Sequence, residues 1–505
     1  MLENHLQQFF NLPKFRRGQL DIINAVLTKK DALAVLPTGG GKSLCFQFPA
    51  TYLQKLVIVI SPLIALMKDQ VMSLQNRGVK AGCLYAQQPE SEKRLIFSQI
   101  NEGGCYVLYL SPERVQKPGF QEWIKNREIA LFAIDEAHCV SQWGHDFREE
   151  YAELKVLKKL RPDVPILALT ASATPMVLDD IAKNLELKNP ERMVHGFYRS
   201  NLFYQVAVCD NDQEKSQMLL QSIKQHPTGR IIVYCGTRKI TEELAGFLRK
   251  HVDQVGFYHA GLSQNERTQM QTDYASGKLR ILVATNAFGM GIDQPDVRLV
   301  VHFQMPANID SLYQEMGRAG RDEQPSTCLL LYAKKDKGLQ SFFITSSPAT
   351  KPIKDLRWRN LNALVAYCEV AECRHAEILT YYKDSTRLKA CGHCDACVPN
   401  SERAIEKPVV AMAAQKSLSK KSAAAKYAVT LSPTEEARFQ VLRTWRKAKA
   451  EELDIPAFVV FGDKTLRDIA QKNPQSLDEL KNIYGIGEAK LEKFGWDLLA
   501  NLSDK

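Results

Sequence analysis

The sequence predicts an α/β protein with two tandem domains, followed by a helical segment that carries a cysteine cluster and by a small all-helical domain. Between residues 20 and 345, short apolar runs alternate with stretches of helical character. Each run is almost continuous in apolar residues, as expected for parallel strands that are buried on both faces. The runs form two series with a break near residues 195–205, which indicates two α/β domains.

The expected strands can be placed one by one. In the first series they are residues 32–37, 56–61, 105–111, 131–135 and 166–170. In the second series they are residues 230–235, 255–258, 279–285, 299–303 and 328–332. Helices are then expected at residues 355–370 and 376–382.

The C-terminal part changes in character. Residues 400–430 are rich in Ala, Lys and Ser, which is typical of a linker, and residues 398–430 carry a net charge of +4. Ser432, Pro433 and Glu435 fit a helix start, with an N-cap, a proline at the first position and a glutamate at the third. Residues 432–503 therefore look like a small helical domain.

Composition excludes several classes of protein. The 505 residues are 45% hydrophobic and 25% charged, which is ordinary for a globular protein and unlike a disordered or collagen-like chain. No stretch approaches the roughly 20 apolar residues of a membrane-spanning helix, and the N-terminus lacks the pattern of a signal peptide. The net charge of +10 permits a polyanionic partner. The 12 cysteines lie mostly in apolar stretches, which favours a reducing compartment.

A phosphate-binding loop is indicated directly after the first strand, in Leu36-Pro37-Thr38-Gly39-Gly40-Gly41-Lys42-Ser43. The glycines allow backbone N–H groups to close around phosphates, and a helix is expected to begin at about Lys42. Lys42 is positioned to reach the β- and γ-phosphate oxygens, and Ser43 to hold Mg²⁺. The alternative is a glycine-rich turn with a chance Lys-Ser pair, which the downstream carboxylates disfavour.

Those carboxylates are Asp135 and Glu136, which follow four apolar residues at the end of an expected strand. Asp135 is expected to hold Mg²⁺, directly or through water, and Glu136 to orient or deprotonate the attacking water. A helix start is the alternative for an isolated Asp-Glu pair.

Taken together, these motifs resemble a superfamily 2 helicase, and closely the RecQ family of DNA helicases. The resemblance covers roughly residues 6–397, with a further match to the helical HRDC domain at 432–503. It implies two RecA-like domains at 1–200 and 201–345, a zinc-binding subdomain at 346–399, a basic linker at 400–430 and an HRDC-like domain at 431–505.

The resemblance also assigns residues to ATP and DNA. Phe15-Arg16-Arg17-Gly18-Gln19 looks like the adenine-reading segment, in which Gln19 pairs with the adenine edge and Arg16 lies against the ring. The stretch from Ala137 to Arg148 is similar to the aromatic-rich loop of RecQ proteins, where Trp143, Phe147 and Arg148 would contact unstacked bases and a phosphate.

The second domain carries a stretch that looks like the arginine motif of superfamily 2, Tyr313-Gln314-Glu315-Met316-Gly317-Arg318-Ala319-Gly320-Arg321-Asp322. Arg318 and Arg321 are three residues apart, which predicts that they lie on one helix face. Across the cleft they would meet the γ-phosphate, with Arg321 as the arginine finger.

The cysteine cluster contains Cys391, Cys394 and Cys397 at CxxCxxC spacing, and a tetrahedral zinc site needs a fourth ligand. The family pattern of a cysteine followed by arginine points to Cys373, with Cys368 as a buried spare and His393 as a weaker alternative. An iron–sulfur site and an unliganded cluster remain alternatives.

The leading interpretation is an ATP-dependent 3′-to-5′ DNA helicase that acts in recombination and repair, with ATP, Mg²⁺ and Zn²⁺. Its expected partners are single-stranded and tailed duplex DNA, single-stranded DNA-binding protein and other repair proteins, with no membrane. The expected location is the cytoplasm, with the nucleoid if the organism is bacterial.

Only about 34 residues separate Cys397 from Ser432, too few for the winged-helix domain of many RecQ proteins. A translocase or switch without unwinding, and an RNA-directed superfamily 2 ATPase, are the alternatives.

Overall fold

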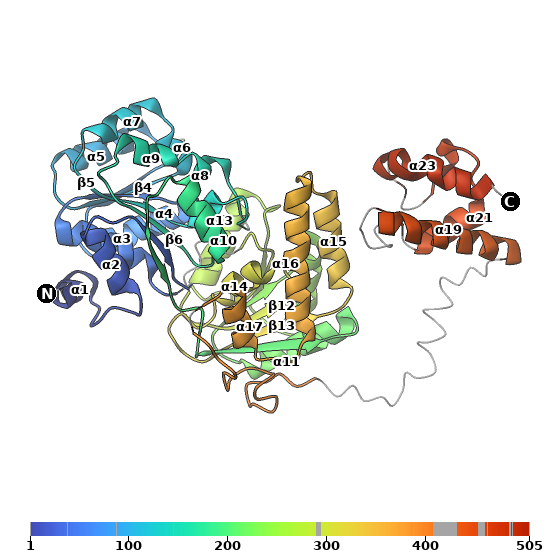
Figure 1. Cartoon of the computed structure of the whole chain (residues 1–505). Coiled ribbons are helices and arrows are strands. Elements are labelled where there is room, and N and C mark those ends of the chain that lie inside the picture. The colour runs from blue at the N-terminus through green and yellow to red at the C-terminus, as the bar shows by residue number, and fades with distance from the viewer. Residues whose placement is uncertain are drawn as a thin grey trace. The chain divides into compact units, whose positions relative to one another are not determined.

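The computed structural model describes residues 2–37, 39–86, 88–144, 146–288, 294–384, 386–407, 432–452, 460–461, 463–483, 486 and 488–503. The chain divides into two compact units: Met1–Asp336 with Ala349–Lys407, and Lys337–Pro348 with Pro408–Lys505. The first unit contains two α/β lobes, blue-to-teal and green-to-yellow in Figure 1. The predicted pair of tandem α/β domains is therefore confirmed.

The first lobe contains a seven-stranded parallel sheet with the strand order β3-β4-β2-β5-β6-β1-β7. Its strands are β1 (Ala32–Val35), β2 (Leu56–Ile60), β3 (Ala81–Leu84), β4 (Tyr106–Leu110), β5 (Ile129–Ile134), β6 (Ile166–Thr170) and β7 (Glu191–Val194). Because all strands run in the same direction, the loops that follow β1, β5 and β6 emerge at one edge of the sheet, where ligands bind in open α/β sheets.

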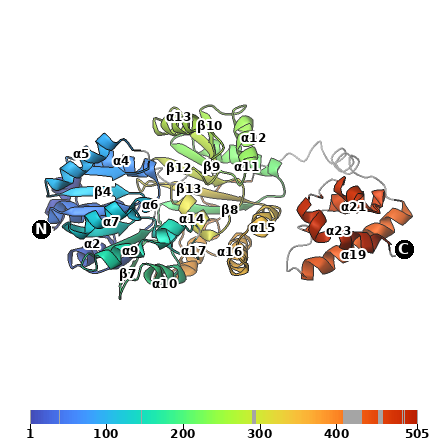
Figure 2. The same cartoon turned by 90° about the horizontal axis from the view of Figure 1, so that it is seen from above.

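Helices cover both faces of this sheet, as the view along the layers shows for α4 and α7 (Figure 2). They are α1 (Leu2–Phe10), α2 (Gln19–Leu27), α3 (Lys42–Leu53), α4 (Ile64–Gln75), α5 (Glu90–Asn101), α6 (Pro112–Val115), α7 (Pro118–Lys125), α8 (Glu149–Ala152), α9 (Lys155–Leu160) and α10 (Pro175–Asn184), with a 3-10 turn η1 (Ala137–Val140).

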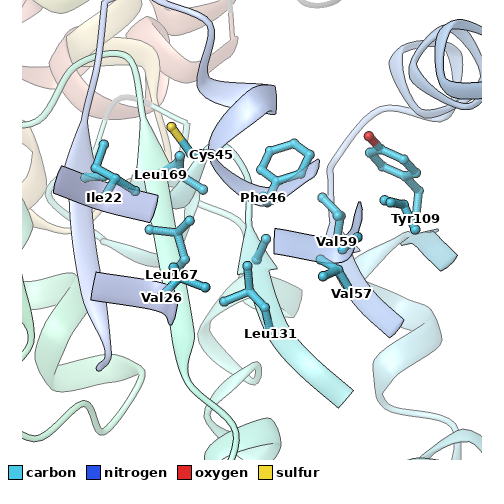
Figure 3. Packing of buried hydrophobic residues seen from close by; sticks show 14 of the residues in the cluster. Ile22, Val26, Cys45, Phe46, Val57, Val59, Tyr109, Leu131, Leu167 and Leu169 are labelled. Atoms are coloured by element: carbon cyan, nitrogen blue, oxygen red, sulfur yellow. The ribbon is translucent and has the colours of Figure 1, made fainter. Parts of the chain in front are cut away.

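The core on one face of the sheet shows why these segments fold together. Ile22 of α2 and Phe46 of α3 pack onto alternate strand residues such as Val57, Leu131 and Leu167, all of them buried (Figure 3). Alternation is expected because successive strand side chains point to opposite faces. This packing fixes α2 and α3, and with them the loop that precedes α3.

The second lobe contains a six-stranded parallel sheet with the order β10-β11-β9-β12-β13-β8. Its strands are β8 (Leu202–Val208), β9 (Arg230–Tyr234), β10 (Val255–Tyr258), β11 (Ile281–Ala284), β12 (Val297–His302) and β13 (Ser326–Tyr332). Its helices are α11 (Asp212–Gln225), α12 (Arg238–Leu248), α13 (Gln264–Ala275) and α14 (Ile309–Met316). The lobe has a separate buried core that includes Met218, Val233 and Val301.

The ten expected strands are all present, with ends that shift by up to two residues. Three further strands, β3, β7 and β8, were not predicted. All three lie at sheet edges, where one side lacks a neighbouring strand. Glu191 and Arg192 make β7 polar, Gln205 interrupts β8, and β3 has only four residues, so none forms a continuous large apolar run.

A helical segment with the cysteine cluster is attached to the edge of the second sheet. It contains α16 (Lys351–Glu369) and α17 (Arg374–Tyr381), close to the two predicted helices. Cys394 forms a parallel bridge with Tyr204 of β8, and the Asp395 backbone N–H donates to the Tyr204 carbonyl (3.0 Å). The Arg374 guanidinium makes an ion pair with Asp395 (2.8 Å). The cluster is thereby held against β8.

The second unit includes α15 (Asp336–Ser346) in part and a helical domain of α19 (Pro433–Glu452), α21 (Asp463–Lys472), α22 (Leu477–Lys481) and α23 (Glu488–Ser503). The predicted helix start is confirmed, because the Ser432 N–H donates to the Glu435 carboxylate (2.6 Å) and the Glu435 N–H to Ser432 Oγ (3.4 Å). Most of the predicted linker, residues 408–430, lies outside the described residues. Among the described helices, none has the length and hydrophobicity needed to cross a membrane.

Candidate active site and metal centre

The glycine-rich loop lies between β1 and α3, as predicted, and α3 begins at Lys42. Gly39 and Gly41 have φ angles of 81° and 74°, in the left-handed region that disfavours side chains. A Cβ on Gly40 would lie 2.9 Å from the Pro37 carbonyl oxygen, so a side chain is excluded there as well. The loop therefore needs its three glycines, and it leads into the N-terminus of α3, where free backbone N–H groups favour phosphate. Thr38, the remaining predicted contact, lies outside the described residues.

The predicted adenine-reading residues contact this loop directly. Gln19 is 2% exposed, and its side-chain amide donates to the carbonyl oxygens of Gly40 (3.1 Å) and Gly41 (3.0 Å). Its Oε1 accepts from the Arg16 backbone N–H (2.8 Å), and the Arg16 guanidinium donates to the Gly39 carbonyl. Gln19 and Arg16 are therefore both hydrogen-bonded to the carbonyl groups of the glycine-rich loop.

The carboxylate pair follows β5 at the same edge of the sheet. Burial, together with the adjacent Glu136 carboxylate, raises the pKa of Asp135 to about 7, while the charge of Lys42 acts in the opposite direction. Lys42 and Asp135 are thus electrostatic neighbours, as the motif pairing predicts. The half-buried Asp135 carboxylate and the Ser43 hydroxyl are hard oxygen donors, and a divalent cation would stabilise the charged form of the carboxylate. These residues fit Mg²⁺.

A chain of polar contacts runs from Glu136 to the second lobe. The His138 Nδ1 lies 3.4 Å from the Glu136 carboxylate and 3.0 Å from Thr170 Oγ1. Thr170 Oγ1 donates to the Ser172 carbonyl (3.1 Å), and the Gln314 side-chain amide donates to Ser172 Oγ (3.0 Å). Gln314 belongs to the arginine motif, and the sequence analysis gave it no role. Its position in the sequence beside Arg318 and Arg321 was the only feature that could have indicated a role for Gln314.

The two arginines lie in the segment between α14 and β13, close to the phosphate loop. A Cβ on Gly39 would be 3.3 Å from Arg321 Cγ, so the stem of Arg321 lies against the loop of the other lobe. Arg318 is buried. The prediction that both arginines share a helix face is wrong, because α14 ends at Met316. Gly320, with a φ angle of 55°, places the arginines in a turn instead.

The aromatic-rich loop begins with η1, next to the carboxylates. Trp143, Phe147 and Arg148 are each half-buried, and the Trp143 backbone N–H donates to Ser141 Oγ (3.1 Å). Arg148 forms an ion pair with Asp146 (3.1 Å), so its charge has a protein partner in this structure. The structure brings these three predicted residues together on one loop, with side chains that are partly accessible.

The four predicted cysteine ligands converge. The sulfur atoms of Cys373, Cys391, Cys394 and Cys397 all lie within 4.8 Å of one another. Cys391 and Cys397 are 3.9 Å apart, which matches the edge of about 3.8 Å that Zn–S bonds of roughly 2.3 Å give in a tetrahedron. Burial acts to raise the pKa of Cys397, but it is outweighed by hydrogen bonds from the backbone at Gly392 and Cys391, which lower this pKa to about 7. The donor set fits a closed, structural zinc site.

The alternative ligands fit less well. Cys368 is buried on α16 and does not belong to this group of sulfurs. His393 uses both ring nitrogens elsewhere: Nδ1 donates to the Leu202 carbonyl (3.0 Å), and Nε2 accepts from the Tyr198 hydroxyl (2.8 Å). These contacts tie the cysteine cluster to the segment that joins the two lobes.

Comparison with protein families gives four matches along the chain. They are the DEAD/DEAH box helicase over residues 16–181, the helicase conserved C-terminal domain over 214–323, RecQ zinc-binding over 334–398 and the HRDC domain over 435–502. The helicase Lhr of Mycobacterium smegmatis, solved with ssDNA and AMP-PNP, has a similar fold, with a TM-score of 0.54 and 21% identity over 68% of this chain and 49% of that one. Fold and site together define the class of ATP-dependent helicases.

Similar proteins narrow this class to one family. The ATP-dependent DNA helicase RecQ of Bacillus subtilis (strain 168) is 34% identical in an alignment that covers 97% of this chain and 96% of the relative. The probable ATP-dependent DNA helicase RecS of the same strain is 42% identical over 69% of this chain and 70% of the relative. The chain belongs to the RecQ family of ATP-dependent DNA helicases.

Proposed function

We propose that this helicase couples ATP hydrolysis to 3′-to-5′ movement along single-stranded DNA and unwinds duplexes in recombination and repair. The observation that carries the proposal is the position of Arg321 against Gly39, since it joins the arginine motif of one lobe to the phosphate loop of the other. The contact between Gln314 and Ser172 supports it, because it crosses between the same lobes. A nucleotide bound at this junction would favour closure, and its hydrolysis would permit opening.

Each residue at the junction has a proposed task in hydrolysis. Gln19 and Arg16 recognise the adenine, and Thr38, Gly39, Gly40, Gly41, Lys42 and Ser43 surround the phosphates. Glu136 accepts a proton from the attacking water, and His138, which is hydrogen-bonded to Thr170, lies beside its carboxylate. Arg318 and Arg321 stabilise the charge that develops on the γ-phosphate. Ser43 and Asp135 hold Mg²⁺, which supplies charge neutralisation at the phosphate oxygens when bound.

DNA contact is assigned to the aromatic-rich loop. Trp143 and Phe147 offer ring faces for unstacked bases, and Arg148 offers charge for a phosphate, once released from Asp146. Because η1 connects this loop to Glu136, the binding of DNA to the loop would change the position of the Glu136 carboxylate. Single-stranded and tailed duplex DNA are the proposed substrates, with single-stranded DNA-binding protein and other repair proteins as candidate partners.

The remaining assignments are structural. Cys373, Cys391, Cys394 and Cys397 hold one Zn²⁺, which keeps the zinc-binding segment on the edge of the second sheet. The proposed domain limits are 1–200, 201–345, 346–399, 400–430 and 431–505. A cytoplasmic location beside the nucleoid is proposed from the bacterial relatives and from the reduced cysteines.

The test is the unwinding of a 3′-tailed DNA duplex with ATP and Mg²⁺. We expect strand separation by the wild-type protein and none by a Lys42→Ala variant, which loses the charge that reaches the phosphates. A 5′-tailed duplex serves as the control for direction. Equal unwinding of both tails would contradict the proposed polarity, and activity of the Lys42→Ala variant would contradict the proposed site.

One observation favours a second candidate, a translocase or switch that does not separate strands by itself. The alignment with the Bacillus subtilis RecQ spans 573 positions, 68 more than the 505 residues of this chain, so it contains long gaps in this chain. Between the zinc-binding match, which ends at residue 398, and the HRDC match, which begins at residue 435, there is no room for a winged-helix domain. DNA-stimulated ATP hydrolysis without strand separation would support this candidate. Stimulation by RNA in place of DNA would support an RNA-directed enzyme.

A further inference from the structure

The segment that joins the two lobes, residues 195–201, carries an arginine that no motif predicted. The Arg199 guanidinium donates through Nη2 to the carbonyl oxygens of Ala319 (3.1 Å) and Gly320 (2.9 Å). A Cβ on Gly39 would lie 3.8 Å from Arg199 Nη1. Arg199 therefore lies where the phosphate loop meets the turn that carries Arg318 and Arg321, which we call the arginine turn (residues 317–321).

The arginine turn depends on such contacts for its shape. It begins where α14 ends, so its carbonyl groups have lost their helical partners. The Gly320 carbonyl also accepts from the Asn201 side chain (2.8 Å), and a Cβ on Gly320 would lie 2.5 Å from Asn201 Nδ2. Two donors from the joining segment thus converge on the residue that directly precedes Arg321.

The joining segment is itself anchored from the other side. The His375 ring donates from Nε2 to the Arg199 carbonyl (3.3 Å), and the Tyr198 hydroxyl donates to His393 (2.8 Å). Arg403 donates to the Asn201 carbonyl (2.9 Å). Because its backbone is fixed to the zinc-binding segment, Arg199 can hold the arginine turn at a defined position instead of following it.

We propose that Arg199 is a positioning residue for ATP hydrolysis, which holds the arginine turn so that Arg321 meets the γ-phosphate over the phosphate loop. The inference rests on the proposed function of Arg321 and goes beyond it, because it makes the joining segment part of the catalytic geometry. Displacement of a catalytic group by about 1 Å can cost on the order of 10²-fold in rate. An arginine that acts chiefly through Arg321 should have a much smaller effect once Arg321 is gone, because only Arg318 then remains on the turn.

The test is a double-mutant cycle with Arg199→Ala and Arg321→Ala, read as single-turnover ATP hydrolysis and as the Kd of ATP. We expect Arg199→Ala to lower the hydrolysis rate by about 10²-fold and to change the Kd of ATP by less than about threefold. In the Arg321→Ala background, the same substitution should change the rate by less than about threefold. Arg199→Lys retains the charge but not the planar guanidinium. Its hydrolysis rate should therefore exceed that of Arg199→Ala by less than about tenfold.

The outcomes separate the two proposals. Equal losses from Arg199→Ala with and without Arg321, a loss in ATP affinity alone, or full recovery by Arg199→Lys would each overturn the positioning role. A full hydrolysis rate in Arg321→Ala would overturn the proposed function of Arg321, and the inference with it. Arg403→Ala is the matched control, since Arg403 contacts the same segment but not the arginine turn. A 10²-fold loss there would assign the effect to general loosening of the segment.

Discussion

Single side chains in the aromatic-rich loop are the proposed link between DNA and the carboxylate pair. Phe147 and Trp143 are half-buried, so part of each side chain remains accessible. Gly144 allows the loop to turn back on itself, because a Cβ there would lie 2.3 Å from the His138 carbonyl oxygen. The ring positions and the position of His138 are therefore set by the same tight turn.

We predict that Phe147→Ala weakens stimulation of ATP hydrolysis by single-stranded DNA. Base stacking on an aromatic ring is worth about 1–3 kcal/mol, so the DNA concentration for half-maximal stimulation should rise by roughly five- to 150-fold. The measurement is ATPase rate against DNA concentration. Leu95→Ala, which truncates an exposed apolar residue of α5, serves as the control. An unchanged half-maximal concentration in Phe147→Ala would remove this ring from the DNA site.

At the scale of elements, helix α11 is fastened to the second sheet by a buried ion pair. Lys215 is 0% exposed and donates to the Asp336 carboxylate (2.6 Å) and to the Phe303 carbonyl (2.8 Å). Asp336 also accepts from the Met305 backbone N–H (3.3 Å). The pair thus joins α11 to the ends of β12 and β13.

We predict that Lys215→Ala destabilises the protein by about 3–5 kcal/mol, because it leaves the Asp336 carboxylate buried without its cation. The free energy of unfolding of the second lobe, measured by denaturant titration, gives the size of the effect. Lys335→Ala is the matched control: Lys335 pairs with Asp212, but both side chains are about half exposed, and a surface pair of this kind contributes about 1 kcal/mol or less. Equal effects of the two substitutions would contradict the role of the buried pair.

The cysteine cluster also joins two elements, because it holds the zinc-binding segment against the edge strand β8. We predict one zinc per chain, and loss of that zinc in Cys397→Ser, together with a lower unfolding temperature. Cys368→Ser should retain the metal, because Cys368 lies outside the group of converging sulfurs. Metal analysis after purification measures both. Iron in place of zinc, or full metal content in Cys397→Ser, would contradict the assigned ligands.

Strands were predicted correctly where both faces of the strand are buried. Central strands such as β2 and β5 are continuous apolar runs because helices cover both faces of the sheet. The edge strands β3, β7 and β8 were missed because β3 is short and contains small residues, and β7 and β8 carry polar ones, whereas the fourth edge strand, β10, was predicted. The end of α14 was missed for a related reason. Gly320 donates its N–H to the Val297 carbonyl (2.9 Å), a tertiary contact that replaces the next helical turn.

For the whole molecule, the division into two units separates the ATPase from the helical C-terminal domain. The helices α19, α21, α22 and α23 share a hydrophobic core of their own, which includes Leu442, Phe461 and Leu498. A chain that ends at Lys407 would retain every residue assigned to ATP, Mg²⁺ and Zn²⁺.

We predict that a variant truncated after Lys407 hydrolyses ATP in the presence of DNA at a rate within about threefold of the full chain. Its thermal transition should lack only the contribution of the C-terminal domain, because that domain has a separate core. ATPase assays and calorimetry of the two chains test this. A truncated protein that fails to fold, or that loses hydrolysis, would show that the C-terminal domain supports the ATPase lobes.

The sequence by itself determined the two α/β domains, the glycine-rich loop, the carboxylate pair and the need for a fourth ligand beside the CxxCxxC cluster, which the family resemblance assigned to Cys373. These depend on local patterns: apolar runs, glycines that precede a helix, and ligands whose chemistry requires a fixed number of partners. Only the tertiary structure decided that Arg321 lies against Gly39, that Gln314 reaches Ser172, and that Arg199 holds the arginine turn. These contacts join residues that are more than a hundred positions apart, and they depend on how the two lobes pack, which no local pattern encodes.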